Sequence, residues 1–243
     1  MELLYRDDHL VAVYKPAGWL VHRTPMDPGE RRILMQAVRD AVGRPVFPVH
    51  RLDKPTAGIV VFALDEAGAR RLGAAFARQR VAKTYLAVVR GHTHPEGIID
   101  WPLRDRAYLT RGLEKDSAPR PAVTRYRCLG QCERPDPVGP HPTARYSLLA
   151  LYPEHGRPHQ LRRHLKHIGH PIIGDTTHGD GRHNAYFRRA LGTRRLLLAA
   201  LALTLPHPAD GRPLALRARP DAEFAGVLTA LGWAADDLPP DTD

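Results

Sequence analysis

One acidic residue, Asp53, lies in a polar segment between two apolar stretches and is the first candidate for chemistry. The segment runs from His50 to Gly58 and places the basic residues Arg51 and Lys54 beside the acid. A carboxylate that neighbouring cations keep charged can attack an electrophile or remove a proton. An isolated aspartate in a connection more often closes a turn, because its side chain hydrogen-bonds the nearby backbone. The basic surroundings favour the chemical role here.

Predicted strands on both sides would hold this segment in place. Residues 46–49 and 58–64 are short apolar runs, which are typical of buried strands. Asp65 can then cap a helix whose apolar stripe contains Leu72 and Phe76. The acid is therefore expected in a connection that is fixed at both ends.

The rest of the chain predicts many strands and few helices. Further strands are expected at 10–13, 19–22, 83–89, 123–129 and 145–151, with a hairpin of 196–205 and 214–218. Further helices are expected at 30–42, at 158–168 and after Asp221. Residues 104–121 and 133–142 are rich in proline and charge and are expected to be exposed. Without regular alternation of strands and helices, the predicted fold class is α+β.

The charge balance points to a polyanionic partner. The 243 residues include 36 Lys and Arg against 26 Asp and Glu, a formal net charge of +10, and all but five of the basic residues are arginines. Arginine suits bidentate recognition of phosphate, so RNA or DNA is the expected class of partner. A codon bias of the genome toward arginine explains the excess equally well, because net charge does not say where the charges lie.

Several protein classes are disfavoured by the same sequence. No apolar run approaches the roughly 18 residues of a membrane helix, and the acidic N-terminus does not resemble a signal peptide, so a cytoplasmic protein is expected. The two cysteines, Cys128 and Cys132, are too few for a disulfide framework or a four-thiolate zinc site. We expect a single catalytic domain over 1–233 and a flexible acidic tail over 234–243.

At this point five segments carry a resemblance to a known family. In chain order they are 15–18 (Lys-Pro-Ala-Gly), 50–58 (with His-Arg-Leu-Asp), 83–87, 156–164 and 169–175. Together they resemble the motifs of the RluA-type pseudouridine synthases. The resemblance implies a mixed, mostly antiparallel sheet with flanking helices and a central catalytic cleft. It also implies isomerisation of a uridine in RNA to pseudouridine, without a cofactor and without an N-terminal RNA-binding module.

The resemblance also assigns residues to roles. Asp53 matches the essential carboxylate, Arg162 the active-site arginine, and Tyr85 the tyrosine that stacks on the base and assists proton removal from C5. Contacts to the substrate RNA are expected from five further residues: His50, Arg51, Arg157, His159 and Arg163. Taken alone, Arg162 would be read as a solvated helix arginine and Tyr85 as a packing residue of a strand.

Segments 18–23, 35–40, 121–124, 162–165 and 178–180 most resemble family members that modify uridine-65 of tRNA. Ribosomal RNA or another tRNA uridine stays open as the substrate, and the protein is expected to be a monomer. The chain departs from the family pattern at two positions. Ala57 stands where serine is usual and Ala199 where histidine is common, which puts in doubt the hydrogen bonds behind the pocket.

Two functions outside this chemistry would also explain parts of the sequence. Five histidines between positions 155 and 170 suggest a metal site, but no run of carboxylates or thiolates accompanies them, so no metal is predicted. A non-catalytic RNA-binding protein would explain the basic charge. Such a protein has no use for an acid in an RNA-facing pocket, so Asp53 distinguishes the two functions.

Overall fold

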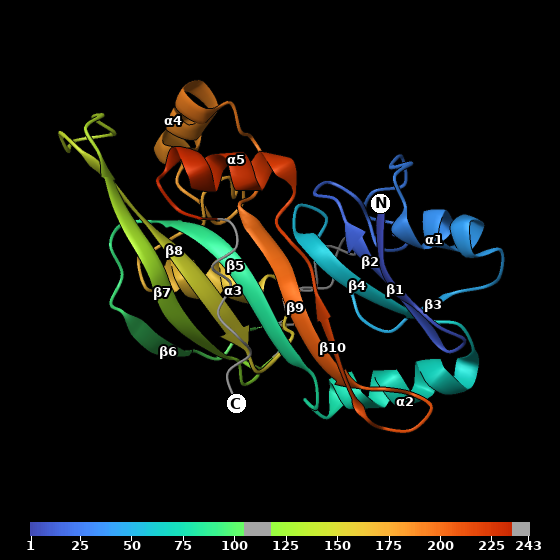
Figure 1. Cartoon of the computed structure of the whole chain (residues 1–243). Coiled ribbons are helices and arrows are strands. Elements are labelled where there is room, and N and C mark those ends of the chain that lie inside the picture. Colours follow the sequence, from blue (N-terminus) through green and yellow to red (C-terminus); the bar gives the residue numbers. More distant parts are fainter. Residues whose placement is uncertain (105–117, 235–243) are drawn as a thin grey trace.

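A computed structural model, which describes residues 1–104 and 118–234, is built on one mixed sheet of ten strands (Figure 1). The strand order is β1-β2-β4-β9-β5-β8-β7-β6, with β3 paired to β4 and β10 paired to β9. The strands are β1 (Glu2–Arg6), β2 (Leu10–Lys15), β3 (Phe47–Pro48), β4 (Ala57–Ala63), β5 (Ala82–Arg90), β6 (Glu96–Asp100), β7 (Val123–Arg134), β8 (Ala144–Pro153), β9 (Leu198–Pro206) and β10 (Pro213–Arg217).

Five helices cover the two faces of this sheet. They are α1 (Leu34–Val42), α2 (Glu66–Ala77), α3 (Gln160–His167), α4 (Gly181–Leu191) and α5 (Ala222–Ala230). Helices α2, α4 and α5 contribute to one large apolar cluster that extends across β2, β4, β9, β5 and β8. On the opposite face, α1 packs over β2 and β4, whereas α3 packs over β5 and β8 and is partly hidden behind the strands in Figure 1. That face therefore has two separate apolar clusters.

Strands β4 and β9 form the one parallel pairing in the described part of the sheet, and it is short. The two strands pair only at Ala57 with Ala199 and at Gly58 with Ala200. The backbones approach so closely that a Cβ on Gly58 would lie 2.1 Å from the Ala200 carbonyl oxygen, and Gly58 also has φ +118°. Only glycine fits this position. We call this contact the β4·β9 seam.

The two departures from the family pattern meet at the seam. Ala57 and Ala199 are register partners, and both are fully buried in the cluster beneath α2, α4 and α5. Their side chains therefore point to the face opposite α1 and α3. The small apolar pair is consistent with a packing position.

Most predicted elements are confirmed, with differences at their ends. The hairpin of β9 and β10 and the strands β2, β4, β5, β7 and β8 lie where expected, and Asp65 caps α2 by accepting a hydrogen bond from the Gly68 amide. Of the strand predicted at 46–49, only the two residues of β3 form a strand. The strand predicted at 19–22 is wrong, because only an isolated bridge from Leu20 to Ile33 forms there.

The helix starts were predicted too early, and three elements were not predicted. Helix α1 begins at Leu34 and α3 at Gln160 rather than at 30 and 158. The unpredicted elements are β1, β6 and α4, and β7 continues to Arg134 into an expected excursion. Residues 105–117 of the other expected excursion, and 235–243 of the predicted tail, lie outside the described residues. In the described ranges, no helix is both long and apolar enough to cross a membrane.

Candidate active site

A cleft of about 540 Å³ lies on the face that carries α1 and α3, close to the seam. Tyr85 of β5 packs against both apolar clusters of this face, which locates the cleft at their junction. The cleft is lined by the β3–β4 connection, by β5, by the start of β9, and by the segment that leads into α3. Six of the predicted site residues line it: Arg51, Asp53, Tyr85, Arg157, His159 and Arg162.

Asp53 and Arg162 form the central contact of the cleft. The Arg162 Nη1 atom donates a hydrogen bond of 3.2 Å to Asp53 Oδ2. The Arg162 side chain is 4% exposed and that of Asp53 is 23% exposed, so the carboxylate is the part that a ligand can reach. The contact therefore holds one oxygen of Asp53 in place while the carboxylate stays open to the cleft.

A second acid, Asp175, holds Arg162 in place. Arg162 donates from Nε to Asp175 Oδ2 at 2.7 Å and from Nη2 to Oδ1 at 2.8 Å, a bidentate arrangement. The amides of Thr177 and His178 also donate to Asp175 Oδ1, each at 2.9 Å. Burial raises the pKa of the Asp175 carboxyl, but the bonds from Arg162 and the two amides outweigh it and hold the pKa below its usual range. Arg162 is thus fixed with Nη1 directed at Asp53.

Lys15 anchors the connection that carries Asp53. Its side chain is fully buried, and Nζ donates to the carbonyl oxygens of Pro16, Trp19 and Lys54 at 2.8–3.1 Å. The amide of Gly18 donates to the same Lys54 carbonyl at 2.8 Å. Burial lowers the pKa of Lys15 to about 7. The backbone next to Asp53 is therefore fixed from β2 and the turn that follows it.

Tyr85 presents a half-buried ring to the cleft. Burial, and secondly the negative charge of Asp53, raise the pKa of the Tyr85 hydroxyl well above its ordinary value. The phenol therefore stays protonated at neutral pH. A neutral ring of this kind suits stacking and hydrogen-bond donation better than it suits proton removal.

His159 approaches Asp53 from the start of α3. It has φ +53°, its Nε2 lies 3.8 Å from Asp53 Oδ2, and its Nδ1 lies 3.0 Å from His178 Nε2. Burial lowers the pKa of both imidazoles, that of His178 to about 4, so both are neutral at pH 7. If His178 donates to Nδ1, the Nε2 of His159 carries the proton and faces the carboxylate favourably. Charge complementarity with Asp53 favours this tautomer.

Two predicted RNA contacts lie elsewhere. His50 stacks on Phe76, with ring centroids 4.5 Å apart, and its Nε2 accepts a hydrogen bond from the Val61 amide. Arg163 donates from Nη1 to the Arg104 carbonyl at 3.0 Å. Neither is among the residues that line the cleft. The sequence placed both residues beside site residues, but the side chains at 50 and 163 diverge from those at 53 and 162.

The histidines that suggested a metal site are engaged individually. His164 contacts Thr124 Oγ1 and the Trp101 carbonyl, His167 stacks on Trp101, and His170 contacts the Arg90 carbonyl. Within 1–104 and 118–234, no group of three or more His, Cys, Asp or Glu residues is placed to hold a metal ion.

The sequence did not assign a role to three residues of this site. Asp175, Lys15 and His178 all lie inside segments that carried the family resemblance. The one sequence signal for these three roles was an ionisable side chain inside a segment that resembled the family. The contacts that connect them to the site are distant in sequence: Asp175 with Arg162 spans 13 positions, His178 with His159 spans 19, and Lys15 with Lys54 spans 39, so local pattern does not reveal them.

Comparison with known proteins agrees with this geometry. Residues 9–167 match the family model described as RNA pseudouridylate synthase. The chain is 50% identical over 235 residues to a tRNA pseudouridine synthase C of Pectobacterium carotovorum subsp. carotovorum, covering 96% of this chain and 62% of that protein. It is 47% identical over 236 residues to the protein of that name from Yersinia pestis, covering 96% and 92% of the two chains.

Solved structures show the same fold. Human RNA Pseudouridylate Synthase Domain Containing 4 superposes with a TM-score of 0.71 at 26% identity, over 95% of this chain and 93% of that chain. Human RNA Pseudouridylate Synthase Domain Containing 1 gives 0.69 at 22% identity, over 100% and 96%. The chain belongs to the RNA pseudouridylate synthase family and is an RluA-type pseudouridine synthase.

Proposed function

We propose that this enzyme isomerises a uridine of tRNA to pseudouridine, with uridine-65 as the target and Asp53 as the essential carboxylate. The observation that carries the proposal is the Asp53–Arg162 contact at the base of an open cleft. The relatives named as tRNA pseudouridine synthase C support the choice of tRNA. The basic charge of the chain suits the same partner.

The reaction needs no outside reagent. The N1–C1′ bond breaks, the base turns, and C5 bonds to C1′; the proton on C5 is then lost and N1 takes up a proton, so that the atoms balance. Asp53 either attacks the nucleotide or removes a sugar proton, and both routes need an ionised carboxylate beside the base. The target base must leave its stack to reach Asp53, at a cost of a few kcal/mol that contacts with RNA phosphates offset. Arg51 and Arg157 line the cleft and are the first candidates for those contacts.

Tritium release from 5-tritiated uridine in tRNA tests the proposal. The native protein is expected to release tritium, and Asp53→Asn is expected to release none while binding tRNA within about threefold of the native affinity, since the substitution changes one charge and little volume. Full activity in Asp53→Asn would disprove the role of the acid. RNA binding without any release by the native chain would favour the non-catalytic function instead.

The target position requires a separate measurement. Pseudouridine mapping of cellular tRNA and ribosomal RNA, with and without the gene, is expected to show loss at uridine-65 of tRNA. Loss at a ribosomal site would assign the alternative substrate. The proposal also includes action as a cytoplasmic monomer.

A further inference from the structure

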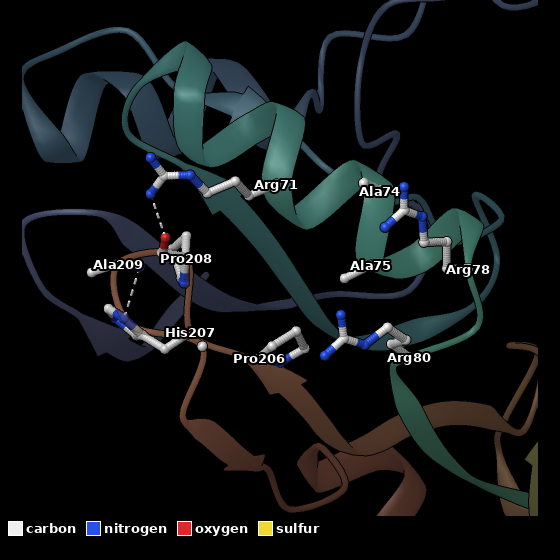
Figure 2. Close-up of a pocket in the computed structure, with 10 residues that line it drawn as sticks. Arg71, Ala74, Ala75, Arg78, Arg80, Pro206, His207, Pro208 and Ala209 are labelled. Atoms are coloured by element: carbon white, nitrogen blue, oxygen red, sulfur yellow. Dashed lines mark hydrogen bonds between the residues drawn. The ribbon is translucent and has the colours of Figure 1, made fainter.

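A basic pocket lies at the end of α2, outside the active-site cleft. It has a volume of about 470 Å³ and is formed by the last turns of α2 and by the turn between β9 and β10. Its lining includes three exposed arginines, Arg71, Arg78 and Arg80, and no carboxylate. Figure 2 shows Arg71 reaching across to the turn, where it donates to the Pro208 carbonyl at 2.6 Å. We call this hollow the α2 pocket.

The charges of Arg78 and Arg80 are uncompensated in the described structure. No carboxylate in residues 1–104 and 118–234 lies within ion-pair distance of either side chain. His207 also lines the pocket, but its Nε2 contacts Asp7 at 2.6 Å. The positive charge available to a ligand therefore comes from the arginines.

The backbone between these arginines adopts a conformation that favours glycine. Gln79 has φ +58° and stands where helix ends usually have glycine. The amide of Arg80 donates to the Ala75 carbonyl and that of Gln79 to the Phe76 carbonyl, which closes the helix in a Schellman motif. This turn fixes the positions from which both arginine side chains leave the helix.

A second hollow lies between the α2 pocket and the cleft. It has a volume of about 500 Å³, shares Arg80 with the α2 pocket and shares Pro153 with the cleft. It also contains Lys83 and Arg125, of which Arg125 is paired with Glu154 at 2.9 Å. From Ala200, opposite Tyr85, to the end of β9 at Pro206 is six residues, or about 20 Å of strand.

From this arrangement we propose that the α2 pocket binds the phosphate backbone of the substrate RNA, at a distance from the target uridine. The inference rests on the proposed function, because it needs an RNA whose target base occupies the cleft. Arginines beside small and proline residues suit phosphates, since no tyrosine, tryptophan or phenylalanine lines the pocket to stack a base. The RNA strand that leaves the cleft passes along the second hollow and reaches Arg78 and Arg80.

Steady-state kinetics with full-length tRNA test this site. The double variant Arg78→Gln/Arg80→Gln is expected to raise KM about tenfold, to leave kcat within twofold, and to reduce the slope of log KM against log salt by about 2. The matched control is Arg188→Gln/Arg189→Gln, which removes the same charge from exposed residues in the last turn of another helix, α4. The control is expected to keep the native KM and salt slope.

The outcomes separate this inference from the proposed function. No pseudouridine formation by the native chain would refute the function itself. Native activity with equal KM and salt slope in the two double variants would refute the RNA site alone. Calorimetric binding of pyrophosphate to the native protein, lost in Arg78→Gln/Arg80→Gln without any change in tRNA kinetics, would show a small-anion site and would also overturn the proposal.

Discussion

At the scale of single residues, the cleft depends on the guanidinium of Arg162, which contacts two carboxylates. Arg162 joins a reachable carboxylate, Asp53, to a buried one, Asp175, whose side chain is 1% exposed. These two contacts of Arg162 differ in geometry. The bidentate bond to Asp175 fixes the guanidinium, and the single bond to Asp53 engages one oxygen of a carboxylate that stays reachable from the cleft.

Removing Asp175 is expected to affect both stability and catalysis. Asp175→Ala leaves a buried guanidinium without its main partner, which costs about 3–5 kcal/mol in the free energy of unfolding. Urea denaturation measures this cost, and kcat is expected to fall at least tenfold because Arg162 loses its orientation. The control Asp40→Ala breaks an exposed ion pair with Arg39 and is expected to cost less than about 1 kcal/mol. Equal costs in both variants would contradict the structural role of Asp175.

The stabilisation from Asp175 is expected to depend on pH. Its pKa is below the ordinary value in the folded protein, so the unfolded chain binds the proton more tightly. The contribution is complete above the unfolded pKa of about 3.9 and is lost as the pH falls through the folded pKa. The difference in unfolding free energy between the native protein and Asp175→Asn should therefore shrink below pH 4. A difference that grows on acidification would contradict this assignment.

At the scale of elements, the β4·β9 seam brings Asp53 and Tyr85 to one cleft. Asp53 precedes β4, and Tyr85 lies on β5. Strand β9 lies between β4 and β5 and pairs with both. The distance between β4 and β9 at this point therefore sets how the acid faces the tyrosine and α3. Gly58 makes that distance possible, because any Cβ would meet the backbone of Ala200.

Gly58→Ala is expected to disrupt this arrangement. The added methyl would lie 2.1 Å from a backbone oxygen, and the positive φ adds further strain. We expect a loss of more than about 3 kcal/mol in unfolding free energy, or no folded protein, by urea denaturation with circular dichroism. Gly73→Ala in α2 is the control, since a Cβ there meets no atom within 4 Å and should stabilise the helix. A native-like melt for Gly58→Ala would contradict the close approach.

Most strands and helices could be predicted from the sequence, whereas the pairing of β4 with β9 could not. Alternating and apolar runs identified β2, β4, β5 and β8, and Asp65 marked the start of α2. The strand expected at 19–22 failed because its backbone bonds go to the start of α1 rather than to a partner strand. The pairing of Ala57 with Ala199, 142 positions apart, has no local signal in either segment.

At the scale of the whole molecule, the candidate active site was also only partly predictable from the sequence. Asp53, Tyr85 and Arg162 were identified by resemblance, and the structure places all three at one cleft. The roles of Lys15 and Asp175 follow only from contacts made through the fold. His50 and Arg163 were expected to contact the substrate RNA, but His50 stacks on Phe76, Arg163 donates to the Arg104 carbonyl, and neither lines the cleft.

The net charge of +10 is expected to govern substrate capture rather than chemistry. Raising the salt concentration from 50 to 200 mM should increase KM for tRNA at least tenfold, because RNA binding releases counterions, and should change kcat less than twofold. Kinetics over that range measure both effects. A large loss of kcat with unchanged KM would indicate that salt acts on the Asp53–Arg162 contact instead.

The seam described above also has a consequence for the order of assembly during synthesis. The strands on the β4 side, with α1 and α2, come from the first 77 residues, and the strands on the β9 side come from residues 82–217. The first part can pair its own strands antiparallel as it leaves the ribosome, but β9 emerges more than 130 residues after β4. Arg162 follows Asp53 by 109 positions, so the contact between them cannot form until late in translation. The cleft, which residues on both sides of the seam line, is complete only once β4 and β9 have paired.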